Sequence, residues 1–311
     1  MEYEESSCKM LDNGGKWRIF TMLQIILQLL MSGIAMGFIY SLVGIEFTLI
    51  WNSSSLVNFG HDKFIVLGAY IFGGTFILGM GLNPVLGLIF TLIAMAIFGA
   101  IVAAGIFNPL RNMFSDIFAV MGTIMLARII TESCRLIWGP TPFTISGFLN
   151  GTTHIGNIVL PNPNIYMIIV SILIVIGLQL IFQKTKIGKA MRCIAQNKEA
   201  SALMGINVPK MIQVSVALSS MICAIIAILI IPIFTVDGNM AGMIGLKGFA
   251  AGVVGGFGYL PGSIVGGLFI GILENICVSF MPAVYKDVVA FVLLIVFLLI
   301  RPQGIMGKKA I

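Results

Sequence analysis

The chain has 311 residues, of which 59% are hydrophobic and only 10% are charged, and its formal net charge is +6. A soluble globular domain carries about 25% charged residues, so a chain this poor in charge could not cover its surface with polar groups in water. The composition therefore excludes a soluble domain. In a membrane protein the positive charge indicates Lys and Arg collected on the cytoplasmic side rather than nucleic-acid binding.

Residues 1–17 are polar and acidic, and they lack the features of a secretory signal peptide. We expect them to form a polar N-terminal segment, followed by a single transmembrane domain over residues 18–311. Long uniform apolar runs satisfy their backbone hydrogen bonds in lipid as helices rather than as alternating barrel strands. The expected fold is all-α, a polytopic transmembrane helical bundle.

Nine apolar segments follow one another along this domain. They cover residues 19–45, 64–80, 84–107, 113–137, 165–182, 212–236, 240–258, 262–280 and 288–300. One span needs about 20 apolar residues, and one or two of these segments are short or interrupted enough to form re-entrant or broken helices. We therefore expect about eight true spans.

The basic residues orient the bundle. The loop 184–210 holds six Lys or Arg against the single acid Glu199, so it is expected to be cytoplasmic. The basic tail, with Arg301, Lys308 and Lys309, is placed on the same side by the four segments between them. The connection 139–164 contains no Lys or Arg and is expected outside. The side of the N-terminus stays open: it lies outside if all nine segments cross, and inside if one near Asn58 is re-entrant.

A short surface helix is predicted within the cytoplasmic loop. Asn197 suits its N-cap, Glu199 lies in the first turn where the helix dipole favours an anion, and Gly205 suits a left-handed end. Its apolar face comprises Ala200, Leu203 and Met204. An isolated helix this short is marginal in water, so it would gain order by docking into a groove on another protein. The alternative is an ordinary basic loop.

The same stretch carries a family resemblance. Glu199-Ala200-Ser201, then three residues, then Gly205 resembles the E-A-A-x-x-x-G signature of bacterial ABC importer permeases. The resemblance implies a coupling helix that docks into an ATP-binding subunit, with Glu199, Ala200, Ser201, Leu203 and Gly205 as coupling residues. Ser201 stands where the family has a second Ala, and Lys198 where a Pro is common.

Two further stretches are similar, more narrowly, to branched-chain amino acid permeases. Asn58-Phe-Gly-His-Asp-Lys-Phe64 resembles N-F-A-H-G-E-F, and the Gly-rich run 245–267 resembles the family's pore segment. Small residues at this spacing also let membrane helices pack backbone to backbone. The resemblance implies a permease subunit in a bacterial inner membrane that translocates branched-chain or similar small amino acids. It further implies ATP-binding subunits, a second related permease and an extracytoplasmic solute-binding protein.

Four polar residues are candidates for the translocation path. Asn58 and His61 lie between apolar segments, where irregular backbone must face protein or water, and they predict a re-entrant turn lining the path. The alternative is an interfacial loop that reaches the headgroups. Lys247 is the expected partner of Glu274, because an ionisable group inside an apolar run costs about 3 kcal/mol and faces a cavity or a partner.

Three other charged residues lie in or beside the apolar segments. Asp62 and Lys63 replace the family's usual Gly and Glu, and they are expected to form a local ion pair. Glu46 lies beside an apolar run at a position where the family has a small residue.

Other functional classes are weaker. The chain has no Gly-x-x-x-x-Gly-Lys-Ser/Thr motif, so its energy must come from a partner. The histidines His61 and His154 are far apart and lack ligand partners, which argues against a metal site, and no cofactor is expected. No credible catalytic constellation supports an enzyme. The remaining alternative is a secondary transporter or channel acting without an ATPase, for which Glu46 and Glu274 could be coupling carboxylates.

Overall fold

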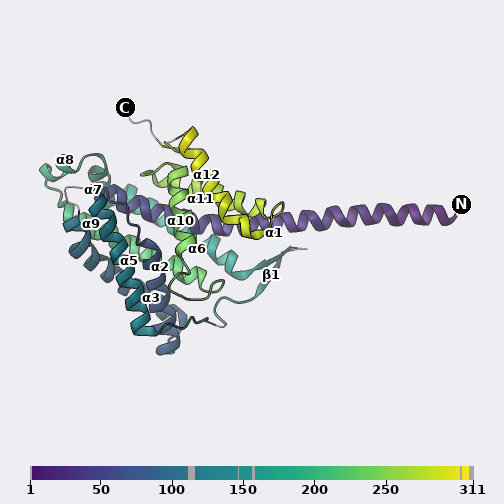
Figure 1. Ribbon diagram of the computed structural model, residues 1–311, viewed down its shortest axis with the longest axis horizontal. Coiled ribbons are helices and arrows are strands. Elements are labelled where there is room, and N and C mark those ends of the chain that lie inside the picture. Colours follow the sequence, from purple (N-terminus) through teal and green to yellow (C-terminus); the bar gives the residue numbers. More distant parts are fainter. Residues whose placement is uncertain (1, 111–115, 146, 156–157, 302, 308–311) are drawn as a thin grey trace.

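The computed structural model describes residues 2–110, 116–145, 147–155, 158–301 and 303–307. The expected segment start at residue 113 and the tail residues Lys308 and Lys309 lie outside these ranges. Helices dominate the fold (Figure 1). The elements before the largest loop are α1 (Glu2–Ser54), α2 (His61–Ala69), the π-helical η1 (Tyr70–Gly79), α3 (Pro84–Val102), the π-helical η2 (Ala103–Phe107), α4 (Asn108–Leu110) and α5 (Asp116–Trp138).

The second half begins with a small hairpin and returns to helices. Its elements are β1 (Thr152–Ile155), β2 (Ile158–Pro161), α6 (Asn162–Lys184), α7 (Lys186–Gln196), α8 (Lys198–Leu203), α9 (Val208–Ile230), α10 (Gly242–Gly255), α11 (Leu260–Cys277), the 3-10 turn η3 (Ala283–Tyr285) and α12 (Lys286–Ile300).

The helical bundle predicted from the sequence is confirmed. Within the described residues, seven helical segments are long and apolar enough to cross a membrane. They are Ile26–Ser54, His61–Gly79, Pro84–Leu110, Ile117–Trp138, Asn162–Lys184, Val208–Ile230 and Leu260–Cys277. The other two expected segments form α10 and α12, which have only 14 and 15 residues. Both are shorter than a full span of about 20 residues, so seven candidate spans are found where about eight were expected.

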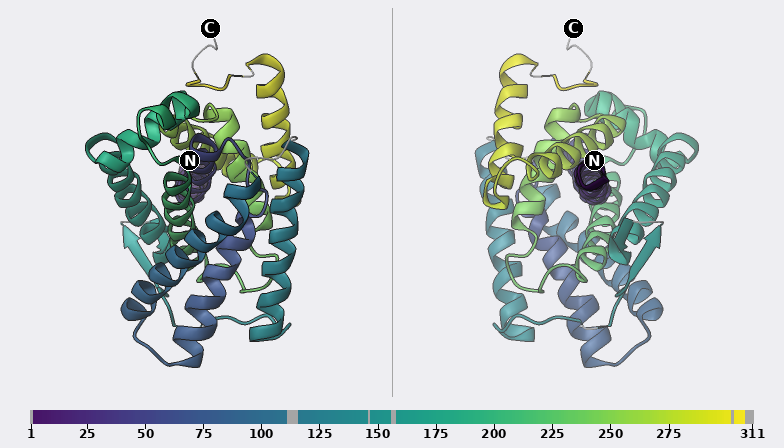
Figure 2. Two further views of the ribbon diagram at one scale, coloured as in Figure 1. Left: turned by 90° about the vertical axis from the view of Figure 1, so that its left-hand side faces the viewer. Right: turned by 90° about the vertical axis from the view of Figure 1, so that its right-hand side faces the viewer.

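The first helix is longer than the sequence predicted. The segment expected over residues 19–45 is part of α1, which continues to Ser54 and is buried almost throughout residues 35–50. The polar residues at its end do not break it, because Ser53 and Ser54 donate to backbone carbonyls one turn earlier. Viewed along α1, the other helices lie around its buried half (Figure 2).

The hairpin β1–β2 was not predicted. Its two four-residue strands pair antiparallel, with Thr152 opposite Pro161, and they are too short for a period-2 pattern to stand out in a loop rich in Thr, Pro and Gly. The hairpin and α8 lie at opposite ends of the bundle (Figure 1). The N-terminal turns of α1 extend from the hairpin end, whereas Ser54 at its other end contacts Lys198 of α8. If α8 is cytoplasmic, the N-terminus therefore lies outside.

The described tail residues 303–307 lie at the α8 end of the bundle. Ile305 and Met306 donate backbone hydrogen bonds to Val254 and Gly255 at the end of α10. Gly258, just beyond α10, accepts from Asn52 near the end of α1.

Glycines hold α1, α10 and α11 at backbone-to-backbone distance, as the small-residue spacing predicted. A Cβ built on Gly271 of α11 would meet backbone atoms of Gly37 on α1, and one on Gly267 would meet the backbone and hydroxyl of Ser41. Between α10 and α11, Gly255 faces Gly262 in the same way. These contacts leave no space for a side chain, so α11 is fixed against both α1 and α10.

This packing predicts a position-specific effect of a side chain. Gly267→Val should destabilise the protein by about 1–3 kcal/mol, because overpacking a tight interface forces the backbones apart. Gly177→Val is the matched control, since Gly177 lies inside α6 with nothing within 4 Å of its Cβ position. Thermal unfolding of both purified variants in detergent should show a lowered melting temperature for Gly267→Val alone. Equal melting temperatures would contradict the packing account.

Candidate functional site

Two breaks in the helices meet inside the bundle. After α1 ends at Ser54, residues 55–60 carry the chain back along α1 before α2 begins at His61. The His61 ring packs against the Phe47 ring at a tilt of 55°, with centroids 4.0 Å apart. Phe47 lies two turns before the end of α1, about 10 Å from it at 1.5 Å per residue. The segment therefore turns back into the bundle, and we refer to residues 55–60 as the re-entrant turn.

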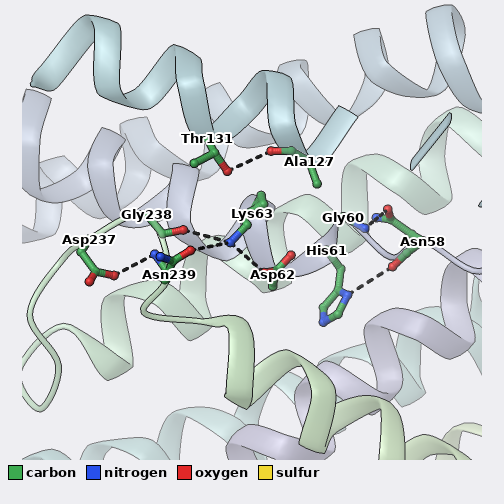
Figure 3. Close-up of polar contacts among 10 residues, drawn as sticks. All are labelled: Asn58, Gly60, His61, Asp62, Lys63, Ala127, Thr131, Asp237, Gly238 and Asn239. Carbon is green, nitrogen blue, oxygen red and sulfur yellow. Dashed lines mark hydrogen bonds and ion pairs between the residues drawn. The ribbon is translucent and has the colours of Figure 1, made fainter. Parts of the chain in front are cut away.

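Helix α5 shows how deep this turn lies. A Cβ on Gly60 would lie 2.8 Å from the Thr123 carbonyl and 3.3 Å from Ala127, the middle residue of α5. The second break, residues 231–241 between α9 and α10, brings Gly238 against Thr131, one turn further toward the hairpin end. The N-terminal ends of α2 and α10 thus meet level with the middle of α5, where Figure 3 shows Ala127 and Thr131 beside Lys63.

An ion pair occupies this meeting point. Lys63 Nζ lies 3.1 Å from Asp62 Oδ2, which confirms the expected local pair. The same ammonium group donates to the Gly238 carbonyl at 2.9 Å and to Asn239 Oδ1 at 3.5 Å, so it ties α2 to the second break (Figure 3). The two charged side chains keep 14% and 16% of their surface exposed. We name this cluster the midplane site; it comprises Asn58, His61, Asp62, Lys63, Gly238 and Asn239.

Two buried groups of the midplane site retain hydrogen-bonding capacity. Asn58 Oδ1 accepts from Gly60 N at 3.0 Å, and His61 Nδ1 lies 3.2 Å from the Asn58 carbonyl. Asn58 Nδ2 and His61 Nε2 are buried and have no hydrogen-bond partner. No side chain caps the first turn of α2 or of α10. The midplane site therefore presents one unused donor, Asn58 Nδ2, and one unused acceptor, His61 Nε2, beside two positive helix ends.

The other two predicted path residues form a separate cluster. Lys247 Nζ lies 2.6 Å from Glu274 Oε1, as expected, and 2.6 Å from Asp287 Oδ1. Lys286 Nζ lies 3.3 Å from the same Glu274 oxygen, and the Tyr40 hydroxyl lies 3.5 Å from it. Glu274 and Lys247 are buried, and this network joins α1, α10, α11 and α12.

The structure does not bring the four predicted path residues together. His61 lies against Gly245 of α10, whereas Lys247, two residues later and about 200° around the helix, reaches Glu274 on α11. Glu274 is three residues from the end of α11. The Lys247–Glu274 network thus lies on another side of α10 and toward the hairpin end of the bundle.

The predicted surface helix is α8, and its expected ends are confirmed. Asn197 Oδ1 accepts from Ala200 N at 2.9 Å, and Gly205 has a φ of +84°. Leu203 and the following Met204 are 90% and 84% exposed. Ser201 differs from the rest of the motif, because it is buried and its hydroxyl donates to the Asn197 carbonyl. The exposed apolar face is therefore uncovered in this chain.

Helix α8 is attached to the start of the re-entrant turn. Lys198 Nζ donates to the Ser54 carbonyl at 2.5 Å. Ser55 follows in a left-handed conformation with a φ of +58°, which is unusual for a residue other than Gly. A groove of about 580 Å³ separates the two elements, and Glu199 is among its lining residues. A displacement of α8 would act directly on the segment that carries Asn58 and His61.

Several residues of these sites were not singled out by the sequence. Asn239 and Gly238 reach the midplane site only because α9 ends at Ile230, six residues before the expected boundary. Asp287 and Lys286 join Glu274 from the start of α12, where their opposite charges were a usable signal. Ser219 donates to the buried Glu46 at 2.7 Å. The sequence does not distinguish it from the other two serines of α9.

Comparison with known proteins identifies the family. The family model described as "Branched-chain amino acid transport system / permease component" matches residues 29–298. The chain belongs to this family. It is therefore a transport permease component and a multi-pass membrane protein rather than an enzyme.

The curated relatives agree with this assignment. The high-affinity branched-chain amino acid transport system permease protein BraD of Pseudomonas aeruginosa is 29% identical over 92% of this chain and 97% of its own length. The corresponding LivH of Escherichia coli is 26% identical over 92% and 96%. A probable LivH of Methanocaldococcus jannaschii is 27% identical over 86% and 88%.

A solved structure supports the fold. PsaBC from Streptococcus pneumoniae, determined in complex with a Fab, superposes with a TM-score of 0.51 at 12% identity, over 90% of this chain and 92% of the other. At that identity the likeness concerns the fold alone. Among the described residues of this permease, no group of three or more His, Cys, Asp or Glu could hold a metal ion.

The buried network predicts an asymmetry in stability. Glu274→Gln should cost about 3–5 kcal/mol, because it leaves buried Lys247 without its closest buried partner. The double variant Lys247→Met/Glu274→Leu should recover part of that loss, since it removes both charges. The control is the exposed pair Glu132–Arg135, whose charged atoms lie 3.1 Å apart. Glu132→Gln should change the free energy of unfolding by less than about 1 kcal/mol. Equal melting temperatures for Glu274→Gln and Glu132→Gln would contradict a stabilising role of the buried Lys247–Glu274 pair.

Proposed function

We propose that this permease is the channel-forming subunit of an ATP-driven importer for branched-chain or similar small amino acids. The observation that carries the proposal is α8, a capped surface helix whose Leu203 and Met204 are almost fully exposed. An apolar helix face of this kind is suited to a groove on another protein. The partner is an ATP-binding subunit, and Glu199, Ala200, Leu203 and Gly205 shape the docking helix.

The contact between Lys198 and Ser54 supplies a route for coupling. When the ATP-binding subunit moves α8, the Lys198–Ser54 hydrogen bond transmits the displacement to residues 55–60. This re-entrant turn ends at Asn58 and His61, so the motion reaches the midplane site without crossing the tightly packed α1–α11 interface. Ser201 anchors α8 from its buried side and does not contact the partner.

The polar chemistry of the path favours a zwitterion with an apolar side chain. The midplane site offers one cation, one anion and two helix N-termini, flanked by Phe, Met and Leu side chains. A highly charged solute would lose its hydration there without enough compensation. A second related permease would complete the path, and an extracytoplasmic solute-binding protein would deliver the substrate at the hairpin end.

A secondary transporter acting alone is the second candidate, favoured by one observation. Glu46 is buried in α1, and its Oε2 has no hydrogen-bond partner. A carboxyl group at this depth is a candidate ion-coupling site. In that case the isolated chain would move substrate with an ion gradient, and Glu46→Gln would abolish the movement.

Uptake of radiolabelled leucine, isoleucine and valine into proteoliposomes tests the proposal. The complex with ATP-binding subunits, the second permease and the binding protein should accumulate at least one of them with ATP, and this chain alone should accumulate none. Ion-driven uptake by the isolated chain would favour the second candidate. Uptake of sugars or metal ions with no amino acid would remove the substrate class.

The coupling helix gives a further prediction in the same assay. Gly205→Val should strain the left-handed end of α8 by about 1–2 kcal/mol and abolish ATP-driven uptake while the complex still inserts. Gly81→Val is the matched control, because Gly81 also has a positive φ, of +62°, with nothing within 4 Å of its Cβ position. It lies in the loop after η1, away from α8, so it should retain uptake. Loss of uptake in both variants, or in neither, would contradict the role of α8.

A further inference from the structure

We propose that Asp62 and Lys63 recognise the two charges of a zwitterionic aliphatic amino acid at the middle of the membrane. Lys63 Nζ binds the substrate carboxylate, Asp62 binds the substrate ammonium group, and the side chain lies against Phe59, Met243 and Leu246. This inference rests on the proposed function and names the substrate contacts of that site.

The Asp62–Lys63 ion pair lies deep inside the bundle. Asp62 and Lys63 lie level with Ala127 and Thr131 in the middle of α5, yet each keeps part of its side chain exposed. Charged groups at that depth are unfavourable against lipid, and they face water or protein instead. The side of the chain that carries them therefore faces the translocation path rather than the bilayer.

The two charges of a zwitterion balance those of Asp62 and Lys63. A zwitterion brings one carboxylate and one ammonium group, so it can take the place of each residue's present partner. Lys63 then exchanges Asp62 for the carboxylate, and Asp62 exchanges Lys63 for the ammonium group, with no net charge added to the site. A ligand with only one of the two charges would leave Asp62 or Lys63 unpaired in a low-dielectric environment.

Two helix ends and two unpartnered polar atoms surround the ion pair. The positive first turns of α2 and α10 meet here without side-chain caps, and helix N-termini favour a carboxylate. Buried Asn58 Nδ2 is a donor without a partner, and buried His61 Nε2 is an acceptor without one, because His61 Nδ1 donates to the Asn58 carbonyl. Asp62 Oδ2 lies 3.9 Å from the Cβ position of Gly242, the first residue of α10. A substrate carboxylate would supply the anion at this position when Asp62 turns to the ammonium group.

An apolar surface lies beside the charges of Asp62 and Lys63. Met243 and Leu246 lie at i and i+3 on α10, next to the Gly242 and Gly245 positions that face Asp62. They are 44% and 45% exposed, and Phe59 is 42% exposed. Charges on one side and an apolar strip on the other match the two ends of leucine, isoleucine or valine.

Photo-leucine, a diazirine analogue of leucine, tests these contacts directly. The complete complex in proteoliposomes is supplied with photo-leucine, irradiated and mapped by mass spectrometry. We expect adducts on Phe59, Met243 or Leu246. Lys63→Met and Asp62→Asn should each lower both the adduct yield and leucine uptake at least tenfold. The variant Glu132→Gln/Arg135→Met removes an ion pair of the same 3.1 Å length from an exposed surface and should change neither.

The outcomes separate the possible failures. Adduct yield and uptake are compared for the assembled fraction of each complex, isolated by size-exclusion chromatography, which separates misassembly from the loss of substrate contacts. Leucine uptake that persists in both variants would overturn the inference and leave the proposed function intact. Adducts confined to other segments would do the same, because they would make the ion pair only a structural contact. Absence of uptake of any amino acid by the unaltered complex would instead overturn the proposed function.

Discussion

Backbone hydrogen bonding in lipid is the constraint on which this architecture depends. A helix can be interrupted inside a membrane only where protein or water satisfies the freed N–H and C=O groups. Here the break after α1 finds Thr123 Oγ1 for Phe59 N and Asn58 Oδ1 for Gly60 N. The break before α10 is satisfied partly by the pairing of Val236 with Phe143 and partly by Lys63.

The two breaks are consequently interdependent. Lys63 from one break supplies the hydrogen bond that the Gly238 carbonyl of the other requires, and the ammonium charge is balanced by Asp62. Contacts of Gly242 and Gly245 with His61 and Asp62 of α2 hold the N-terminal end of α10 in place. Polar groups, helix ends and an apolar strip are therefore gathered at one depth, and the chain can expose charge there without placing it in lipid.

The sequence was sufficient for the class of fold, because apolar runs of about 20 residues dictate helices in a membrane. It also predicted α8 closely, since Asn197 and Gly205 act through local backbone geometry alone. The boundaries of α1 and α9 were wrong because they depend on tertiary partners. Glu46 stays inside α1 through Ser219 on α9, and α9 ends early where its chain turns toward α2.

The functional clusters show the same division. Ion pairs between residues of opposite charge, such as Asp62 with Lys63 and Lys247 with Glu274, could be proposed from the sequence. Their separation by α10 could not, because it follows from which face of α10 each residue occupies. The hydrogen bond from Lys198 to Ser54 joins residues 144 positions apart and carries no sequence signal. The link between α8 and the midplane site therefore required the structure.

Thiol accessibility in the assembled complex tests most directly whether the midplane site faces an aqueous path. After replacement of the native cysteines, Met243→Cys beside the site and Ile97→Cys near the middle of the span that contains α3 are compared, as both positions are exposed in this chain. A small hydrophilic thiol reagent should modify the cysteine at position 243 in membranes, and saturating amino acid substrate should slow that reaction. The cysteine at position 97 should stay unmodified because it faces lipid. Equal reactivity at the two positions, or no protection of position 243 by any branched-chain amino acid, would contradict the account.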